Sequence, residues 1–280
     1  MNRRAFLRTA AWTGAGAVVG MTTYAIGIEP HWTKVVEREL VIRQLPPELR
    51  GLRLVQLSDL HVGPRVSPEH LISALKSAAQ LKPDIVVITG DFITYSRAQG
   101  SAPFQELAAV LAHSPRGRLA TLGILGNHDY GLDWHQPAVP ARVQSVAEQA
   151  GIRILRNDVA SVRGLDIIGV DDLWGKRANP LGAFSKRTAD AAIALCHNPD
   201  SVDRPEWRSY QGWILAGHTH GGQCKPPFLP PPLLPVDNKR YTAGEIDAGG
   251  GRHLYINRGL GYLIKARFNV RPEITLFTLL

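Results

Sequence analysis

The sequence predicts an α/β fold in which two mixed sheets form a sandwich flanked by helices. Through most of the chain, short apolar runs of strand length alternate with helical stretches, a pattern typical of a largely parallel sheet. Later apolar runs follow one another with little helix between them, and this predicts a second sheet with mixed pairing. The chain of 280 residues shows no internal repeat and no linker that would divide its main part.

The expected strands are short apolar runs, except that the first alternates apolar and polar residues. These strands are 35–41, 52–57, 85–89, 119–125, 152–155, 165–170, 191–196, 213–216, 254–256 and 273–279. Helices are expected at 68–81, 104–111 and 140–150. Pro68 opens the first of them and Gly151 stops the last. The proline-rich stretch 226–235 predicts an extended loop.

The first 28 residues have the character of a targeting segment. A paired arginine, Arg3-Arg4, is followed by Phe6, Leu7 and Arg8, and this resembles a twin-arginine export signal. The uncharged stretch 9–28 is only weakly hydrophobic and shows no helical stripe. We therefore expect 1–28 to be a signal that is either removed or kept as an anchor, and 29–280 to be one domain. An amphipathic first helix of the domain is the alternative.

Charge and cysteine content exclude several classes of protein. The formal net charge of +8 favours anionic partners, including anionic membrane surfaces, and a solvated basic surface is the plainer explanation. No basic run is interleaved with aromatic residues, so we expect no specific nucleic-acid partner. Two cysteines, Cys196 and Cys224, are too few for a disulfide scaffold or a Cys-rich zinc motif, and one disulfide between them stays open. We expect a monomer.

Polar side chains follow five of the expected strands, each at the carboxyl end of its strand. Because the carboxyl ends of parallel strands converge on one crevice, these side chains should lie together. Gly90, Gly126 and Gly217 let the backbone turn sharply just before them. The seven polar residues of interest are Asp59, His61, Asp91, Asn127, His197, His218 and His220.

Seven polar side chains at one rim are costly unless something pairs them, and divalent cations would do so. Carboxylate, imidazole and amide oxygen without thiolate suit Mn, Fe, Zn or Ni, and we favour Mn or Zn. The pairs Asp59-x-His61 and His218-x-His220 should each place two ligands on one side of an extended chain, since positions i and i+2 share a face. Each fragment alone is common, but five in this order make chance a poor explanation.

Together these fragments resemble the calcineurin-like metallophosphoesterase family. The resemblance covers nearly the whole chain after the export signal. It implies a four-layer α/β/β/α fold and two divalent metal ions per chain. The tail fragments Arg258-Gly259-Leu260-Gly261 and 271–274 are similar to a bacterial exported or membrane-associated subgroup, which includes phosphodiesterases similar to hydrolases of UDP-diacylglucosamine.

The resemblance also implies a division of the ligands between the two metals. One metal would be bound by Asp59, His61, Asp91 and His220. The second metal would be bound by Asp91, Asn127, His197 and His218, so that Asp91 bridges. One departure is Thr94, where many members carry an acidic or amide residue, and this affects the support of the bridging site rather than the ligands.

We assign the residues after Asn127 to catalysis. His128 would act on the leaving group as proton donor or charge stabiliser, and Asp129 would fix its tautomer and raise its pKa. A simple loop cap is the alternative for Asp129. Five further histidines, at 31, 70, 113, 135 and 253, are expected at the surface. Trp134 and the segment 171–174 are expected in loops near the rim, either as a substrate lip or packed under a loop.

The expected function is metal-dependent hydrolysis of phosphoester bonds, most simply as a phosphodiesterase on a cell-envelope or lipid-linked phosphoester. The alternatives are a phosphomonoesterase or nuclease of the same fold, or a metal-binding envelope protein without turnover. The expected partners are the substrate and the twin-arginine export machinery, with membrane association open. Export would place the enzyme in the periplasm or on the outer face of the cytoplasmic membrane or cell wall, away from cytoplasmic UDP-lipids.

Overall fold

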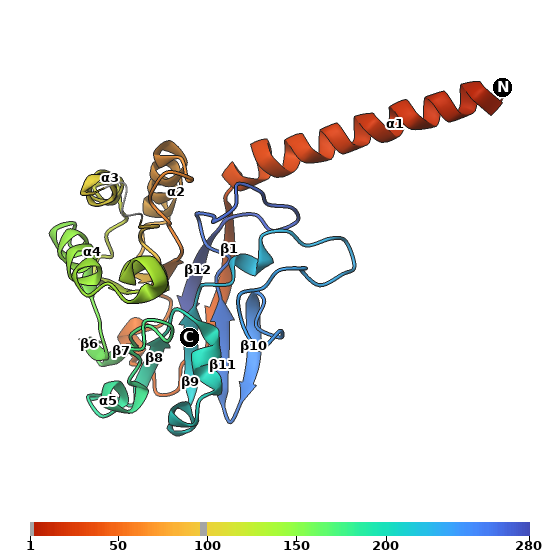
Figure 1. Cartoon of the computed structure of the whole chain (residues 1–280). Helices are drawn as coiled ribbons and strands as arrows, with labels where there is room; N and C mark the ends of the chain where they lie inside the picture. The colour runs from red at the N-terminus through yellow and green to blue at the C-terminus, as the bar shows by residue number, and fades with distance from the viewer. Residues whose placement is uncertain (1–2, 96–99) are drawn as a thin grey trace.

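The computed structural model describes residues 3–95 and 100–280 (Figure 1). Met1 and Asn2, at the start of the predicted export segment, lie outside the described residues. Two six-stranded sheets form the centre of the domain, as the sequence predicts. Three helices cover the first sheet, and α5 with short 3-10 turns covers the second (Figure 1). The predicted four-layer arrangement is confirmed.

The first sheet has the strand order β1-β12-β2-β3-β4-β5. Its strands are β1 (Lys34–Leu40), β2 (Arg53–Leu57), β3 (Ile85–Thr89), β4 (Ala120–Ile124), β5 (Arg153–Ile154) and β12 (Glu273–Leu279). Strands β2 to β5 are parallel, and only the pairing of β12 with β2 is antiparallel. The carboxyl ends of β2, β3 and β4 therefore meet at one edge of the sheet.

The second sheet has the order β10-β11-β9-β8-β7-β6. Its strands are β6 (Asp158–Val162), β7 (Leu165–Gly169), β8 (Ala191–Leu195), β9 (Gly212–Ala216), β10 (Gly244–Gly249) and β11 (Arg252–Ile256). The inner strands β7, β8, β9 and β11 are parallel, and the two edge strands pair antiparallel with them. This mixed pairing confirms the predicted second sheet.

Three hydrophobic cores hold the layers together. Apolar side chains of α2 (Pro68–Gln80), α3 (Ala102–Leu111) and α4 (Ala138–Gln149) pack on the outer face of the first sheet. A second core fills the space between the sheets, and a third lies between the second sheet and α5 (Pro180–Phe184) with neighbouring turns. Apolar residues on both faces of the central strands explain their continuous apolar runs.

Besides the short 3-10 turns, the sequence misses two strands and one α-helix among the described residues, and each is short or only partly buried. Strand β6 and strand β10 lie at opposite edges of the second sheet and alternate exposed or half-buried residues with more buried ones, so neither forms an apolar run. Helix α5 has only five residues, too few for a periodic pattern. The loop 226–235 contains no helix or strand, as predicted. Cys196 and Cys224 are both free, which closes the open question of a disulfide.

The N-terminal segment forms helix α1 (Arg3–Thr23), which projects away from the domain (Figure 1). Its described side chains are exposed, so it is not packed as a first helix of the domain. Among the described residues, no helix is both long and apolar enough to cross a membrane. Contacts with the domain begin after α1: the Ala25 carbonyl accepts a hydrogen bond from the Arg267 amide (2.9 Å), and the Tyr24 ring lies edge-on to Phe268. The expected boundary between the targeting segment and the domain, at residues 28 and 29, therefore lies within the part of the chain that follows α1 and contacts the domain.

Candidate metal centre

The predicted ligands stand on backbone that ordinary side chains rarely adopt. Five of them have a positive φ between 49° and 71°. These five are Asp59, His61, Asp91, His218 and His220. Non-glycine residues in this left-handed region are uncommon, and such strain is concentrated at functional sites. The turns begin directly after β2, β3 and β9, so each strand end is bent toward the same crevice.

Two glycines allow the strand ends to approach one another. A Cβ on Gly126 would lie 2.3 Å from Oδ1 of Asp91, and a Cβ on Gly217 would lie 2.0 Å from Oγ of Ser58 and 2.4 Å from Oδ2 of Asp59. Any side chain at either position would collide with a predicted ligand or its neighbour. The sequence predicts sharp turns at these glycines, whereas in the structure neither has a positive φ and both allow close packing.

The first group of donor atoms comes from the ends of β2 and β9. Nε2 of His220 lies 3.3 Å from Oδ1 of Asp59 and 3.0 Å from Nε2 of His61. Nε2 of His61 lies 3.8 Å from the same carboxylate oxygen. All three side chains are buried. We call Asp59, His61 and His220 the first cluster; their donor atoms could hold one metal ion.

The second group comes from the ends of β3, β8 and β9. Nε2 of His197 lies 3.1 Å from Oδ2 of Asp91 and 3.3 Å from Nδ1 of His218. We call Asp91, His197 and His218 the second cluster, and it too could hold a metal ion. Oδ2 of Asp91 also lies 3.5 Å from Nε2 of His61. The Asp91 carboxylate therefore faces both clusters.

Asn127 provides an independent test of whether the site fits a metal. Its side chain is buried, and neither its Oδ1 nor its Nδ2 has a hydrogen-bond partner within the described part of the protein. An unpaired buried amide is costly, so a native structure rarely retains one without a further partner. A carbonyl oxygen next to carboxylate and imidazole donors suits a divalent cation. The residues present fit a dinuclear metal centre.

Burial and neighbouring charges set the protonation of the donor groups in the metal-free protein. Burial would raise the pKa of Asp91, but the neighbouring His197 holds it well below its ordinary value. Burial opposes the charge of His197, yet Asp91 raises its pKa to about 10. Burial and the charge of His197 lower the pKa of His218 to about 3. Because His197 would carry a proton in the metal-free protein, metal binding must release it.

Comparison with known protein families agrees with this fold and with the seven donor residues. A family model for calcineurin-like phosphoesterases matches residues 52–222, which is more than half of the chain. The chain belongs to the calcineurin-like phosphoesterase family. The match begins just before β2 and ends just after His220, so it spans all seven donor residues.

Relatives with curated names agree with this membership. The chain is 31% identical over 287 residues to phosphodiesterase YaeI of Escherichia coli, covering 100% of this chain and 99% of YaeI. It is 34% identical over 298 residues to the metallophosphoesterase YkuE of Bacillus subtilis, covering 100% and 98%. It is 26% identical over 305 residues to the UDP-2,3-diacylglucosamine pyrophosphatase LpxG of Chlamydia trachomatis, covering 90% and 91%. This member of the family is therefore a phosphoester hydrolase with a dinuclear divalent metal centre.

Outer contacts fix the imidazole rings of this phosphoesterase. Nδ1 of His61 lies 3.0 Å from the Thr94 hydroxyl, so the unusual Thr94 does support a ligand. Nδ1 of His197 donates to the Thr89 carbonyl (2.7 Å), and Nε2 of His218 donates to the Pro235 carbonyl (2.9 Å). Such bonds on the far ring nitrogen set the tautomer and leave the other nitrogen free for a metal.

His128 lies at the mouth of the centre and is only partly buried. Its ring stands edge-on to that of His61 with centroids 4.9 Å apart, and its backbone amide donates to Oδ1 of Asp91 (2.9 Å). Burial lowers the pKa of its side chain, although Asp91 acts in the opposite direction. The position suits a group that meets the leaving oxygen of a substrate.

The prediction that Asp129 orients His128 is wrong. Both oxygens of the Asp129 carboxylate accept backbone hydrogen bonds: Oδ1 from the amides of Phe92 and Ile93 (2.9 and 3.2 Å), and Oδ2 from Gly126 (2.9 Å). The pKa of His128 is lowered rather than raised. Asp129 is a cap that ties the turn after β4 to the turn after β3, which is the alternative considered for it.

Two further expectations need correction. The pairs Asp59-x-His61 and His218-x-His220 do not lie on extended backbone, because all four residues have positive φ. The turn sends His218 to the second cluster and His220 to the first. His70 is not a surface residue: it is buried in α2, where Nε2 of its ring donates to the Leu260 carbonyl (3.2 Å).

Sequence reasoning missed one buried residue of the site, Arg267. Its Nη2 donates to the carbonyls of Arg258 and Gly261 and lies 3.4 Å from Nδ1 of His220. Trp174, which was expected near the rim, stands edge-on to His218 with ring centroids 4.5 Å apart, and Trp134 packs against it. No local sequence signal separates Arg267 from a surface arginine, because its partners are backbone carbonyls brought together by folding.

Proposed function

We propose that this protein is a metal-dependent phosphodiesterase of the cell envelope that acts on a lipid-linked or wall-linked phosphoester. The observation that carries the proposal is the position of Asp91, whose Oδ2 lies within 3.5 Å of Nε2 of both His61 and His197. One carboxylate shared by two donor clusters can hold two divalent ions side by side, as a two-metal phosphoester hydrolase does.

The seven donor residues would hold the two ions as the resemblance implies, with Asp91 between them. Two bound ions would supply Lewis acidity for the phosphoryl group and lower the pKa of the attacking water. His128 would meet the leaving oxygen at the mouth, as proton donor or as charge stabiliser. The buried walls keep the donor groups fixed, so little reorganisation is needed when charge develops on phosphorus.

The donor set guides the choice of metal. Four imidazoles, two carboxylates and one amide without any thiolate suit Mn, Fe, Zn or Ni, and we favour Mn or Zn. The preference for diesters rests on the names of the relatives, YaeI as a phosphodiesterase and LpxG as a pyrophosphatase of a lipid-linked substrate.

The location that we propose is outside the cytoplasmic membrane, reached by the twin-arginine route. The paired Arg3-Arg4 supports this, and that route carries folded proteins, which suits an enzyme that must load metal first. In this compartment a cytoplasmic UDP-lipid is out of reach. Lipid-linked phosphates and wall-polymer diesters therefore become the substrate classes to test.

The test is hydrolysis of bis-p-nitrophenyl phosphate and p-nitrophenyl phosphate by the full chain, with Mn, Zn, Ni or no metal. The Asp91→Ala variant removes the shared carboxylate, and Asp158→Ala is the matched control because Asp158 is a partly exposed residue of β6 paired with Arg153 and Lys186. We expect metal-dependent diester cleavage in the wild type and in Asp158→Ala and none in Asp91→Ala.

Other outcomes would change the proposal in defined ways. Cleavage of the monoester alone would make the protein a phosphatase. Degradation of single-stranded DNA in the same assay would favour a nuclease. Two bound metals per chain without hydrolysis of either ester would favour a narrow substrate or a metal-binding envelope protein, and would contradict a general phosphodiesterase.

A further inference from the structure

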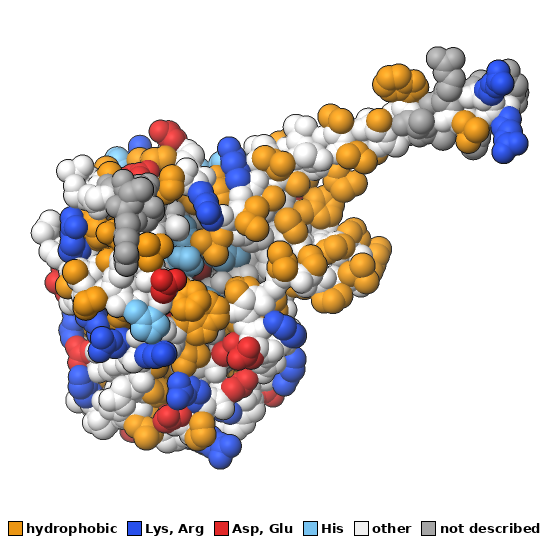
Figure 2. Space-filling model, in the orientation of Figure 1, with side chains coloured by type: hydrophobic (Ala, Val, Ile, Leu, Met, Phe, Trp, Pro, Cys, Tyr) orange, Lys and Arg blue, Asp and Glu red, His pale blue; other side chains and the backbone are white. Residues whose placement is uncertain are grey.

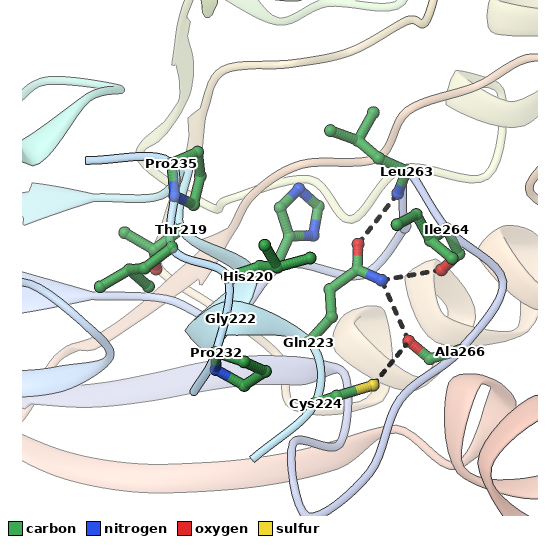
Figure 3. Close-up of a pocket in the computed structure, with 12 residues that line it drawn as sticks. Thr219, His220, Gly222, Gln223, Cys224, Pro232, Pro235, Leu263, Ile264 and Ala266 are labelled. Atoms are coloured by element: carbon green, nitrogen blue, oxygen red, sulfur yellow. Dashed lines mark hydrogen bonds between the residues drawn. The ribbon is translucent and has the colours of Figure 1, made fainter. Parts of the chain in front are cut away.

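An apolar pocket of about 340 Å³ lies beside the first cluster (Figure 3). One wall is the proline-rich loop, with Leu233, Leu234 and Pro235, and the opposite wall is formed by Leu263, Ile264 and Ala266. Among the described residues that line it, no Lys, Arg, Asp or Glu occurs. Its volume lies within the range of small-molecule sites.

The polar side chains in this pocket are already engaged. The Gln223 amide accepts a hydrogen bond from the Leu263 amide (3.0 Å) and donates to the carbonyls of Ile264 (2.7 Å) and Ala266 (3.0 Å), as Figure 3 shows. The Thr219 hydroxyl donates to the Thr242 carbonyl (2.6 Å). Because these polar groups already have hydrogen-bond partners in the protein, an apolar ligand can fill the pocket without leaving them unpaired.

The exception is His220, which lines the pocket and is also a member of the first cluster. Pro235, at the same end, presents its carbonyl to His218 of the second cluster (2.9 Å). The pocket therefore starts at the metal centre and leads away from it between two apolar walls. A ligand that fills both would need a phosphate at one end and a hydrocarbon at the other.

The surroundings of the pocket are also apolar. Phe228, Leu229, Leu233 and Ile264 are exposed on its two walls or the adjoining loop. Figure 2 shows hydrophobic side chains gathered on this loop and along α1, which projects beside it. The segment after α1 contacts the domain next to the wall formed by Leu263, Ile264 and Ala266, where the Ala25 carbonyl accepts a hydrogen bond from the Arg267 amide. Exposed apolar surface of this kind marks a site of contact with lipid or protein.

We propose that this pocket binds the hydrocarbon chain of an amphiphilic phosphoester whose phosphate lies at the metal centre. The proposal rests on the phosphodiesterase function and adds to it the place and chemistry of the substrate's tail. The occupant is a single alkyl or acyl chain, because the lining is apolar, the polar end is the metal centre, and the apolar loop and α1 lie beside the pocket.

The first test compares methyl, butyl and octyl p-nitrophenyl phosphate as substrates of the Mn-loaded full chain, each below its micellar concentration. Burial of one methylene is worth about 0.8 kcal/mol, so KM should fall about fourfold for each carbon that enters the pocket. Because the leaving group is the same, the chemistry is constant along the series. Equal KM values for the methyl and octyl esters would overturn the proposal.

Matched variants locate the effect. Leu233 and Ile264 are 70% and 62% exposed, so Leu233→Asn and Ile264→Asn should fold while making the walls polar. Both should reduce the preference for the octyl over the methyl ester at least fourfold. Phe228→Asn is the control, since Phe228 is fully exposed on the same loop and does not line this pocket. A preference that survives in both wall variants would place the chain elsewhere.

Cys224 gives a measurement that does not depend on turnover. It lines the pocket and is half-buried, whereas Cys196, the other cysteine, is buried in the core. Octyl phosphate should slow alkylation of Cys224 by a maleimide, and methyl phosphate should not. If no diester is cleaved but octyl phosphate protects Cys224, the phosphodiesterase function fails and the pocket stands. Cleavage of all esters without protection would overturn the pocket alone.

Discussion

The two donor clusters share Asp91 but are supported in different ways. In the second cluster, the far ring nitrogens of His197 and His218 donate to backbone carbonyls. In the first cluster, His61 relies on the Thr94 hydroxyl and His220 lies 3.4 Å from the Arg267 guanidinium. A substitution can remove a side-chain partner but not a carbonyl, so the first cluster should be much more sensitive to mutation around it.

The first cluster also depends on the two ends of the chain. The Gly261 amide donates to the Asp59 carbonyl (2.7 Å), which holds the 258–261 turn against the ligand. The Glu29 carboxylate accepts the amides of Asn269 and Val270 and so ties the C-terminal loop to the N-terminal segment. In the second cluster, His197 is tied to the Thr89 carbonyl at the end of β3 and His218 to the Pro235 carbonyl. The first metal should therefore be the more weakly retained one.

The largest effect is expected for Asp91→Ala, because Asp91 faces both clusters. We predict a loss of about 1,000-fold or more in diester hydrolysis together with the loss of both metals. Asp59→Ala should remove the first metal and leave the second. Metal content by elemental analysis of the dialysed variants measures this; loss of only one metal in Asp91→Ala would show that Asp91 is not shared.

The next largest effect is expected for His128→Asn, which distinguishes a loss of catalysis from a loss of metal binding. Loss of a general acid should lower kcat by about 100- to 10,000-fold, while the metal content stays near two per chain. The measurement is steady-state kinetics beside elemental analysis. If the variant loses metal instead, His128 is a ligand, which its proximity to His61 and Asp91 would then explain.

Thr94→Val tests whether the two clusters are supported separately. It removes the hydroxyl that contacts Nδ1 of His61 without changing side-chain volume much, so affinity for the first metal should fall about 10- to 100-fold. Binding of the second metal should be unchanged. Calorimetric titration of the metal-free protein resolves the two events. Equal weakening of both would contradict the idea that the clusters are separately supported.

The smallest effect is expected for His70. Its ring donates a hydrogen bond to the Leu260 carbonyl, in the 258–261 turn that lies against the first cluster. Burial lowers the pKa of His70 to about 4, below its ordinary value of 6.5. The folded protein then binds fewer protons than the unfolded one between these values, so stability is present above pH 6.5 and lost as the pH falls toward 4.

The slope from this single group is about 1.4 kcal/mol per pH unit, and His70→Gln should remove it. Urea unfolding of metal-free protein across this pH range provides the measurement. His113→Gln, at an exposed position, is the control. An unchanged slope in His70→Gln would mean that His70 remains accessible to protons in the folded state.

Much of the fold could be predicted because burial leaves a clear pattern. Strands such as β3 and β8 are buried on both faces and therefore appear as continuous apolar runs. Edge strands β6 and β10 are half-exposed, and their mixed composition hides them. Likewise, the burial of His70 is not predictable, because a single polar residue in a helix does not reveal that a distant carbonyl accepts its hydrogen bond.

The donor residues could be selected because each follows a strand, and parallel strands bring their ends together. The residues that hold these donor side chains in place could not be predicted in the same way. Glu29 bonds to a backbone amide 240 residues away, and Arg267 bonds to carbonyls of the preceding turn that only the folded loop brings together; no residue pattern encodes such partners. Asp129 was assigned to its neighbour His128, but its carboxylate bonds instead to amides of another turn, which only the folded chain brings near.

The most direct test of the two-metal account is a titration of metal-free full-length protein with Mn²⁺ while cleavage of bis-p-nitrophenyl phosphate is followed. The account predicts little activity at one equivalent, since the more strongly supported second cluster fills first, and full activity only when two are bound. Full activity at one equivalent, with no further gain at two, would contradict a shared dinuclear centre.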